Sequence, residues 1–311
     1  MPIALAIAIF IISCIALAKS STSLVGNLNN IASYLGMSTF TISFLIMATA
    51  TSLPELFVGI MSSIRGEAVL ALGNVIGSNI ADLTIVAGIA ATFARGILIE
   101  KRINREDIFF MNLAAFAPLI LLWDAKLSRT DGALLVTLYL FYILKLIRER
   151  KSYSQKGEAA NSILKNLLSF FMWVGLLVGS TYGVVMTAQR IASLLGVPLV
   201  LVGIFAVALG TSLPELTFEI RAMRKQQGGM AMGNLLGSVI ANATLILGVS
   251  ALIAPIHVTH FPLFATSSIF LVLTALLFTS FLRSGHRLSW KEGIILVFFY
   301  MIFITVSMLV S

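Results

Sequence analysis

Three acidic residues stand inside long apolar stretches of the sequence, where they could bind cations. Glu55 and Glu215 each end a Thr-Ser-Leu-Pro-Glu motif, and Asp82 lies in the apolar stretch that follows the first motif. If these stretches cross a membrane, a charge at the bilayer centre costs roughly 3 kcal/mol on insertion scales. No Lys or Arg lies near these acids in the sequence to neutralise them. We therefore favour ligand roles over acids that stay protonated or only cap a broken helix.

Hydroxyl groups and a proline accompany the first acid. Thr51 and Ser52 lie four and three residues before Glu55, so on a helix the three side chains share one face. Pro54 has no backbone donor and frees the carbonyl group four residues earlier, that of Ala50. The same spacing recurs in three other sets: Thr211, Ser212, Pro214 and Glu215; Ser78 and Asp82; Ser238 and Asn242.

The candidate ligands are all carboxylate, hydroxyl, amide or carbonyl oxygens, and the motifs contain no His, Cys or Met. Oxygen-only sites suit sodium and calcium rather than zinc or copper. Magnesium is a weaker candidate because it prefers to keep its waters. Glu219 lies one turn beyond Glu215 and close to Arg221, and for it we expect a local ion pair or an entrance role.

The composition predicts a membrane protein. Of 311 residues, 59% are hydrophobic and 11% are charged, about half the charged fraction of a soluble protein. The formal charge of +8 does not indicate a nucleic-acid partner, because Lys and Arg stand in the breaks between apolar stretches. Cys14 is the only cysteine, which excludes an intramolecular disulfide. The expected surroundings are the lipid bilayer.

The apolar stretches have the length of transmembrane helices. We expect ten spans, at residues 3–30, 38–62, 68–93, 107–123, 132–148, 164–190, 198–221, 228–253, 262–282 and 290–310. Numbering the breaks alternately places 17 of the 21 Lys and Arg residues on one side. Because basic loops stay in the cytoplasm, we predict a multi-pass plasma-membrane protein with both termini outside.

The sequence repeats itself. Residues 48–88 align without gaps on 208–248, a shift of 160 residues, and Thr-Ser-Leu-Pro-Glu-Leu and Gly-Asn-x-x-Gly-Ser-x-Ile-Ala occur in both copies. The shift divides the chain into two halves with five predicted spans each. Because five is an odd number, the second half enters the membrane from the opposite face. The fold class is therefore predicted as an all-α membrane protein of ten transmembrane helices in two inverted five-helix repeats. Substrates of such folds bind near the bilayer midplane.

The predicted domains follow from this repeat: a first five-helix repeat at 1–148, a cytoplasmic linker at 149–163 and a second repeat at 164–311. Two stripes of small residues predict close helix packing that brings the motif faces within ligand distance of each other. They are Gly73, Gly77 and Ala81 in the first repeat, and Gly233, Gly237 and Ala241 in the second.

The paired motifs resemble the alpha repeats of the calcium/cation antiporter superfamily, specifically its prokaryotic sodium/calcium exchanger branch. The resemblance covers nearly the whole chain and implies a secondary antiporter that exchanges sodium for calcium by alternating access. The ligands it implies are Thr51, Ser52, Glu55, Ser78, Asp82, Thr211, Ser212, Glu215, Ser238 and Asn242, with backbone carbonyls near Ala48 and Ala208. In the archaeal pattern the amide stands in the first repeat and the aspartate in the second, whereas Asp82 and Asn242 have the reverse order.

Other functions stay open at this stage. The nearest alternative is a proton/divalent-cation exchanger of the same fold, although that branch usually carries an acid where Gly77 and Gly237 stand here. A cation channel is less favoured. The chain is not expected to be an enzyme, because it contains no HExxH motif or nucleophile and base pair. We expect no cofactor; sodium and calcium are cargo, and a monomer is the simplest expectation for the oligomeric state.

Overall fold

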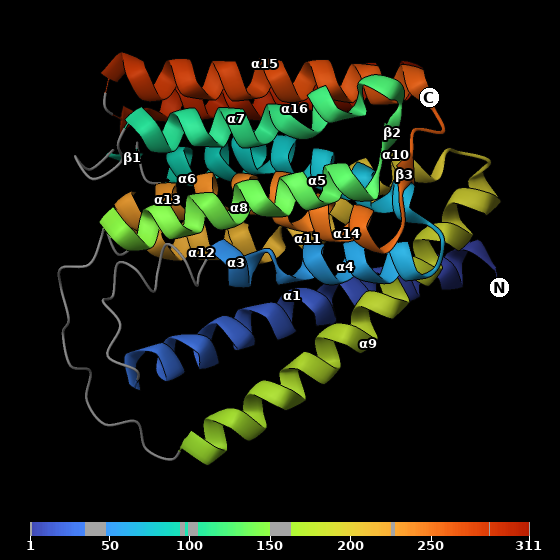
Figure 1. Ribbon diagram of the computed structural model, residues 1–311, viewed down its shortest axis with the longest axis horizontal. Helices are drawn as coiled ribbons and strands as arrows, with labels where there is room; N and C mark the ends of the chain where they lie inside the picture. Colours follow the sequence, from blue (N-terminus) through green and yellow to red (C-terminus); the bar gives the residue numbers. More distant parts are fainter. Residues whose placement is uncertain are drawn as a thin grey trace.

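The computed structural model describes residues 2–34, 48–93, 97–98, 105–149, 163–224, 228–285 and 287–310. Residues 38–47 of the predicted second span and 150–162 of the predicted linker lie outside this range. Almost all described residues are helical, which confirms the predicted all-α class. Most helices run along the long axis of the molecule, α9 crosses it obliquely, and the start of α1 and the end of α16 lie at the same end (Figure 1).

Helices account for the apolar stretches of both halves. The first half contains α1 (Ile3–Tyr34), α3 (Ala48–Thr51), α4 (Leu53–Ile64), α5 (Ala68–Ala81), η2 (Asp82–Val86), α6 (Ala87–Phe93), α7 (Arg105–Leu121), η3 (Leu122–Asp124) and α8 (Arg129–Glu149). The second half contains α9 (Ile163–Leu195), α10 (Leu199–Val202), η4 (Gly203–Val207), α11 (Ala208–Thr211), α12 (Leu213–Arg224), α13 (Gly228–Ile240), η5 (Ala241–Ile246), α14 (Leu247–Ile253), α15 (Phe261–Gly285) and α16 (Trp290–Val310).

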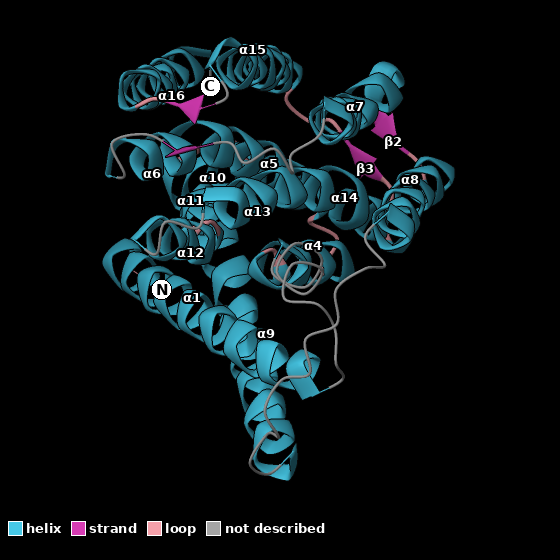
Figure 2. Cartoon of the chain, turned by 90° about the vertical axis from the view of Figure 1, so that its left-hand side faces the viewer, coloured by secondary structure: helices cyan, strands magenta, loops and turns pink. Residues whose placement is uncertain are grey.

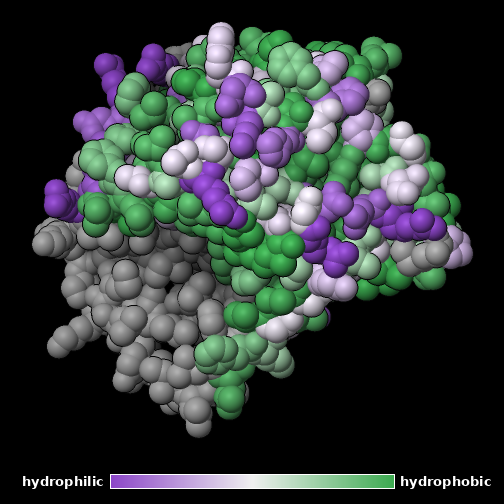
Figure 3. All heavy atoms as spheres, turned by 45° about the vertical axis from the view of Figure 1, so that its right-hand side comes forward, coloured by the Kyte–Doolittle hydropathy of each residue, from purple (hydrophilic) through white to green (hydrophobic). Residues whose placement is uncertain are grey.

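Eight helical segments of the described chain are long and apolar enough to cross a membrane. They coincide with eight of the ten predicted spans. The other two predicted spans correspond to α8, whose ends carry several charged residues, and to α4, a shorter apolar helix whose predicted span extends into residues outside the described range. Figure 3 shows hydrophilic side chains in patches among apolar ones on the face it presents.

Two short antiparallel strand pairs connect the halves. β1 (Ile97–Leu98) pairs with β4 (Arg287–Leu288), and β2 (Lys126–Leu127) pairs with β3 (Ile256–His257). Within one residue, β3 is the counterpart of β1 and β4 is the counterpart of β2 under the 160-residue shift. Each pair therefore contains one strand from each half, and the 160-residue shift relates one pair to the other. Periodicity analysis did not predict these strands, because two residues are too few for a pattern.

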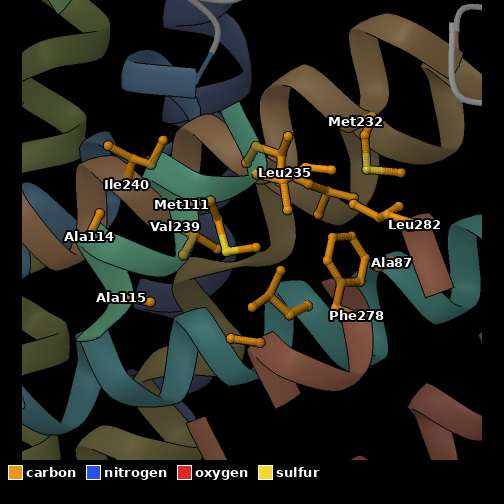
Figure 4. Close-up of a cluster of buried hydrophobic side chains, with 14 of the residues drawn as sticks. Ala87, Met111, Ala114, Ala115, Met232, Leu235, Val239, Ile240, Phe278 and Leu282 are labelled. Carbon is orange, nitrogen blue, oxygen red and sulfur yellow. The ribbon is translucent and has the colours of Figure 1, made fainter. Parts of the chain in front are cut away.

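The helices pack in layers. α1 and α9 lie side by side at one edge of the bundle, α15 and α16 lie at the opposite edge, and the helices that carry the motifs lie between them (Figures 1 and 2). One buried apolar cluster joins both halves, with Met111 from α7, Leu235 from α13 and Phe278 from α15 (Figure 4). The halves thus share their core instead of folding as separate units.

Small residues allow close approach between the halves. A Cβ atom added at Gly77 of α5 would lie 2.1 Å from the backbone oxygen of Ile204 and 2.8 Å from Cβ of Ala208. An added Cβ would lie 2.6 Å from Gly293 O at Gly88 and 2.7 Å from Gly248 O at Gly132. These contacts confirm the predicted close packing for the first small-residue stripe.

Replacing Gly77 with alanine is expected to destabilise the protein by about 1–3 kcal/mol, because the new methyl group collides with backbone that has no space to move. Thermal unfolding in detergent, followed by tryptophan fluorescence, measures the loss. The matched control is Gly179→Ala in α9, where an added Cβ meets nothing within 4 Å. That change should leave stability unaltered or slightly raised, and equal behaviour of the two variants would contradict the packing argument.

Candidate ion-binding site

Each Thr-Ser-Leu-Pro-Glu motif breaks a helix at its serine. Ser52 separates α3 from α4, and Ser212 separates α11 from α12. Their backbone angles are nearly identical, with φ −83° and ψ 8° at Ser52 and φ −81° and ψ 5° at Ser212. The prolines that follow fit the first turn of the new helices, where a backbone donor is not needed. The repeated sequence thus produces the same local break twice.

The carbonyl groups of Ala48 and Ala208 already accept hydrogen bonds from their own turns. Ala48 O accepts from the Ser52 amide at 3.3 Å and from the Thr51 hydroxyl at 3.4 Å. Ala208 O accepts from the Ser212 amide at 2.9 Å and from the Thr211 hydroxyl at 3.1 Å.

Wide helical turns lie beside the motifs. The π-helical segment η2 begins at Asp82, η5 contains Asn242, and η4 directly precedes α11, the helix that ends at Thr211 of the second motif. In matching positions, the Thr84 hydroxyl donates to Ile80 O and the Thr244 hydroxyl donates to Ile240 O. Turns of this kind are rare and frequently occur at functional sites. Sequence reasoning missed them, because the apolar pattern continues unchanged through these turns.

Hydroxyl and amide groups connect the halves reciprocally. The Thr51 hydroxyl donates to Asn234 Oδ1 at 3.2 Å, and its counterpart Thr211 donates to Asn74 Oδ1 at 3.1 Å. The Thr51 and Ser238 hydroxyls lie 3.4 Å apart, as do those of Thr211 and Ser78. Asn74 and Asn234 were not among the predicted site residues. Their place in the repeated Gly-Asn-x-x-Gly-Ser motif was the available signal.

The three acids are buried and lie within electrostatic range of one another. Glu55, Asp82 and Glu215 are at most 1% exposed, and no carboxylate oxygen of the three has a hydrogen-bond partner. Glu55 and Asp82 repel each other, and both repel Glu215. Hydroxyl groups of both halves interact with the acids: those of Thr211 and Ser78 act on Glu55, that of Thr51 acts on Glu215 and that of Ser212 acts on Asp82. Negative charge from both repeats therefore converges in the interior.

All twelve predicted site residues are buried, with exposed fractions of 4% or less. We call this group the central site: Ala48, Thr51, Ser52, Glu55, Ser78, Asp82, Ala208, Thr211, Ser212, Glu215, Ser238 and Asn242. The side-chain polar atoms of Ser52, Ser212 and Asn242 have no hydrogen-bond partner. Within the described ranges, no three Asp, Glu, His or Cys side chains form a cluster that could hold a metal ion.

The expected ion pair of Glu219 with Arg221 was wrong, and the alternative entrance role of Glu219 stays a prediction. The side chain is fully buried, and its Oε1 accepts a hydrogen bond from Asn234 Nδ2 at 3.2 Å instead of pairing with Arg221. Arg221 is exposed at the surface of α12. The two residues are only two positions apart, but about half a helical turn places them on different faces of α12.

Replacing Asn234 with alanine should destabilise the protein more than replacing Asn74, by about 1–3 kcal/mol. Asn234 serves both the Thr51 hydroxyl and the Glu219 carboxylate, so its loss removes a partner from two buried groups and leaves the Glu219 carboxylate without any. Asn74 serves only Thr211, and its own Nδ2 has no partner. Thermal unfolding of the two variants in detergent makes the comparison, and a larger loss for Asn74→Ala would contradict these contacts.

Comparison with known proteins identifies relatives along the whole chain. A family model described as sodium/calcium exchanger protein matches residues 5–148 and 165–309. The sodium/calcium exchanger MaX1 of Methanosarcina acetivorans is 30% identical, over 96% of this chain and 97% of that protein. The inner membrane protein YrbG of Escherichia coli is also 30% identical, over 81% of each chain.

Solved structures agree with these relatives. The sodium-calcium exchanger NCX_Mj, in a structure soaked with sodium and strontium, superposes with a TM-score of 0.66 at 28% identity. The match covers 98% of this chain and 99% of that one. The fold is therefore shared from end to end.

Proposed function

The chain belongs to the sodium/calcium exchanger protein family, and from this membership we propose that it exchanges sodium for calcium across a membrane by alternating access. It is a multi-pass integral membrane protein. The observation that carries the proposal is the pair of buried glutamates, Glu55 and Glu215, presented from two repeated motifs to a shared interior. The resemblance inferred from the motifs is confirmed by the family match.

The chemistry of the central site suits these two ions. Its groups are carboxylate, hydroxyl, amide and carbonyl oxygens, and calcium takes about 6–8 oxygen ligands in flexible geometry. We propose that the twelve residues of the central site supply them. Asp82 and Asn242 stand in the reverse order of the archaeal pattern. The number of carboxylates is still three, but the aspartate charge lies in the first half instead of the second.

Charge explains why such a site exchanges ions and does not leak them. Three buried carboxylates with no ion-pair partner in the described residues are too costly to carry through a closed intermediate. The two halves rearrange only when cations neutralise the site. Sodium and calcium compete for the same oxygens, so the entry of one requires the departure of the other.

We further propose ten transmembrane helices in two inverted five-helix repeats, at 1–148 and 164–311, joined by a cytoplasmic linker at 149–163, with both termini outside. The two segments matched by the family model support this division. The opposite directions of the counterparts α1 and α9 support the inversion (Figure 1). The reciprocal strand pairs support a two-fold relation between the repeats.

Replacing Glu55 or Glu215 with glutamine should reduce calcium uptake by about a hundredfold, because losing a buried charged ligand costs about 3 kcal/mol. The measurement is entry of radioactive calcium into sodium-loaded proteoliposomes diluted into sodium-free buffer. The control is Asp124→Asn, which changes an exposed acid at the end of η3. This variant should transport calcium normally. Undiminished uptake by either glutamine variant would refute the site assignment.

The same vesicles distinguish this function from proton-coupled exchange. We expect an outward proton gradient without sodium to drive little calcium entry, since the oxygen site is neutralised by metal cations in the proposed cycle. Calcium entry driven by protons alone, at a rate equal to that driven by sodium, would assign the chain to the alternative mechanism. A large unitary conductance without counter-ion would instead identify a channel.

A further inference from the structure

Glu219 is a fourth buried carboxylate that the proposed exchange cycle does not use. It lies one helical turn beyond Glu215 on α12 and has no exposed surface. Its Oε1 accepts the hydrogen bond from Asn234, while its Oε2 is buried without any partner. Asn234 in turn accepts from Thr51. A chain of hydrogen bonds therefore connects Glu219 to the central site.

Glu219 breaks the symmetry of the two repeats. Its counterpart, 160 residues earlier, is Gly59, where an added Cβ would lie 2.5 Å from the Ser250 hydroxyl. Ser250 has the counterpart Ala90 in the first half. A long side chain therefore fits at position 219 in the second repeat, whereas the Ser250 hydroxyl occupies the matching space beside Gly59 in the first. As a result, the Asn234 amide has an acidic partner and the Asn74 amide has none.

The charge of Glu219 is not balanced by a basic side chain. Its charged neighbour is Asp82, another acid, which repels it. Neither Glu219 nor Asp82 forms an ion pair with Lys or Arg in the described residues. Isolated buried carboxylates are strongly unfavourable unless a positive charge accompanies them. A compensating charge must therefore reach Glu219 by some route other than a protein side chain.

We propose that Glu219, held by Asn234 and close to Asp82, forms a subsite for one sodium ion beside the central site. The free Oε2 atom of Glu219 is its anionic ligand. Calcium is disfavoured there, because it needs about 6–8 oxygens and one of the two Glu219 oxygens is already engaged by an amide donor. This inference rests on the proposed exchange function and adds to it a sodium position that only the second repeat contains.

Equilibrium binding of radioactive sodium to the full-length protein in detergent, without calcium, tests the subsite independently of transport. Glu219→Gln keeps an oxygen for Asn234 but removes the charge. This variant should bind about one sodium ion fewer per chain than the unaltered protein, because one carboxylate requires one compensating charge. Glu219→Asp should restore part of the lost binding, and Asp124→Asn, at an exposed position, should bind sodium normally.

Sodium binding by Glu219→Gln that equals that of the unaltered protein would overturn the subsite, as would a difference that appears only when the pH is changed. Thermal unfolding of each variant verifies that it is folded, and if Glu219→Gln is unfolded, Glu219→Asp decides by the same measurement. Failure of the exchange function is detected separately, as a lack of sodium-driven calcium uptake by the unaltered protein. A failed subsite with normal uptake leaves the exchange function standing.

Discussion

Glu55, Asp82 and Glu215 hold three carboxylates in the interior, and no Lys or Arg of the described chain forms an ion pair with them. Burying negative charge without a partner is among the most costly arrangements available to a protein. Hydroxyl groups from both halves interact with the acids, and π-helical turns adjoin them. A bound cation would relieve this cost, as the proposed exchange of sodium for calcium requires.

Reciprocity between the halves is the means by which the acids are brought together. Thr51 reaches Asn234 while Thr211 reaches Asn74, and the two strand pairs exchange partners in the same way. α3 packs against α13, and α11 packs against α5. Because each half completes the polar surroundings of the other, the site exists only when both are present. The exception is Glu219, which has a glycine as its counterpart and gives the second half a charge of its own.

Much of this arrangement could be predicted from the residues. The Pro54 and Pro214 motifs indicated broken helices, acids in apolar stretches indicated a buried site, and the 160-residue repeat indicated that two copies of the site face each other. The π-helical turns could not be predicted, because inserting one residue in a helical turn leaves an apolar sequence unchanged. Glu219 was misjudged because nearness in sequence to Arg221 says little about which face of a helix each residue occupies.

In the proposed exchanger, oxygens from both repeats bind the same calcium ion. Anomalous diffraction from crystals of the protein grown with calcium locates that ion. One strong anomalous peak is expected within ligand distance of both Glu55 and Glu215, and it should be lost when sodium replaces calcium. A calcium peak bound by residues of one repeat alone, or one that persists at high sodium, would contradict this proposal.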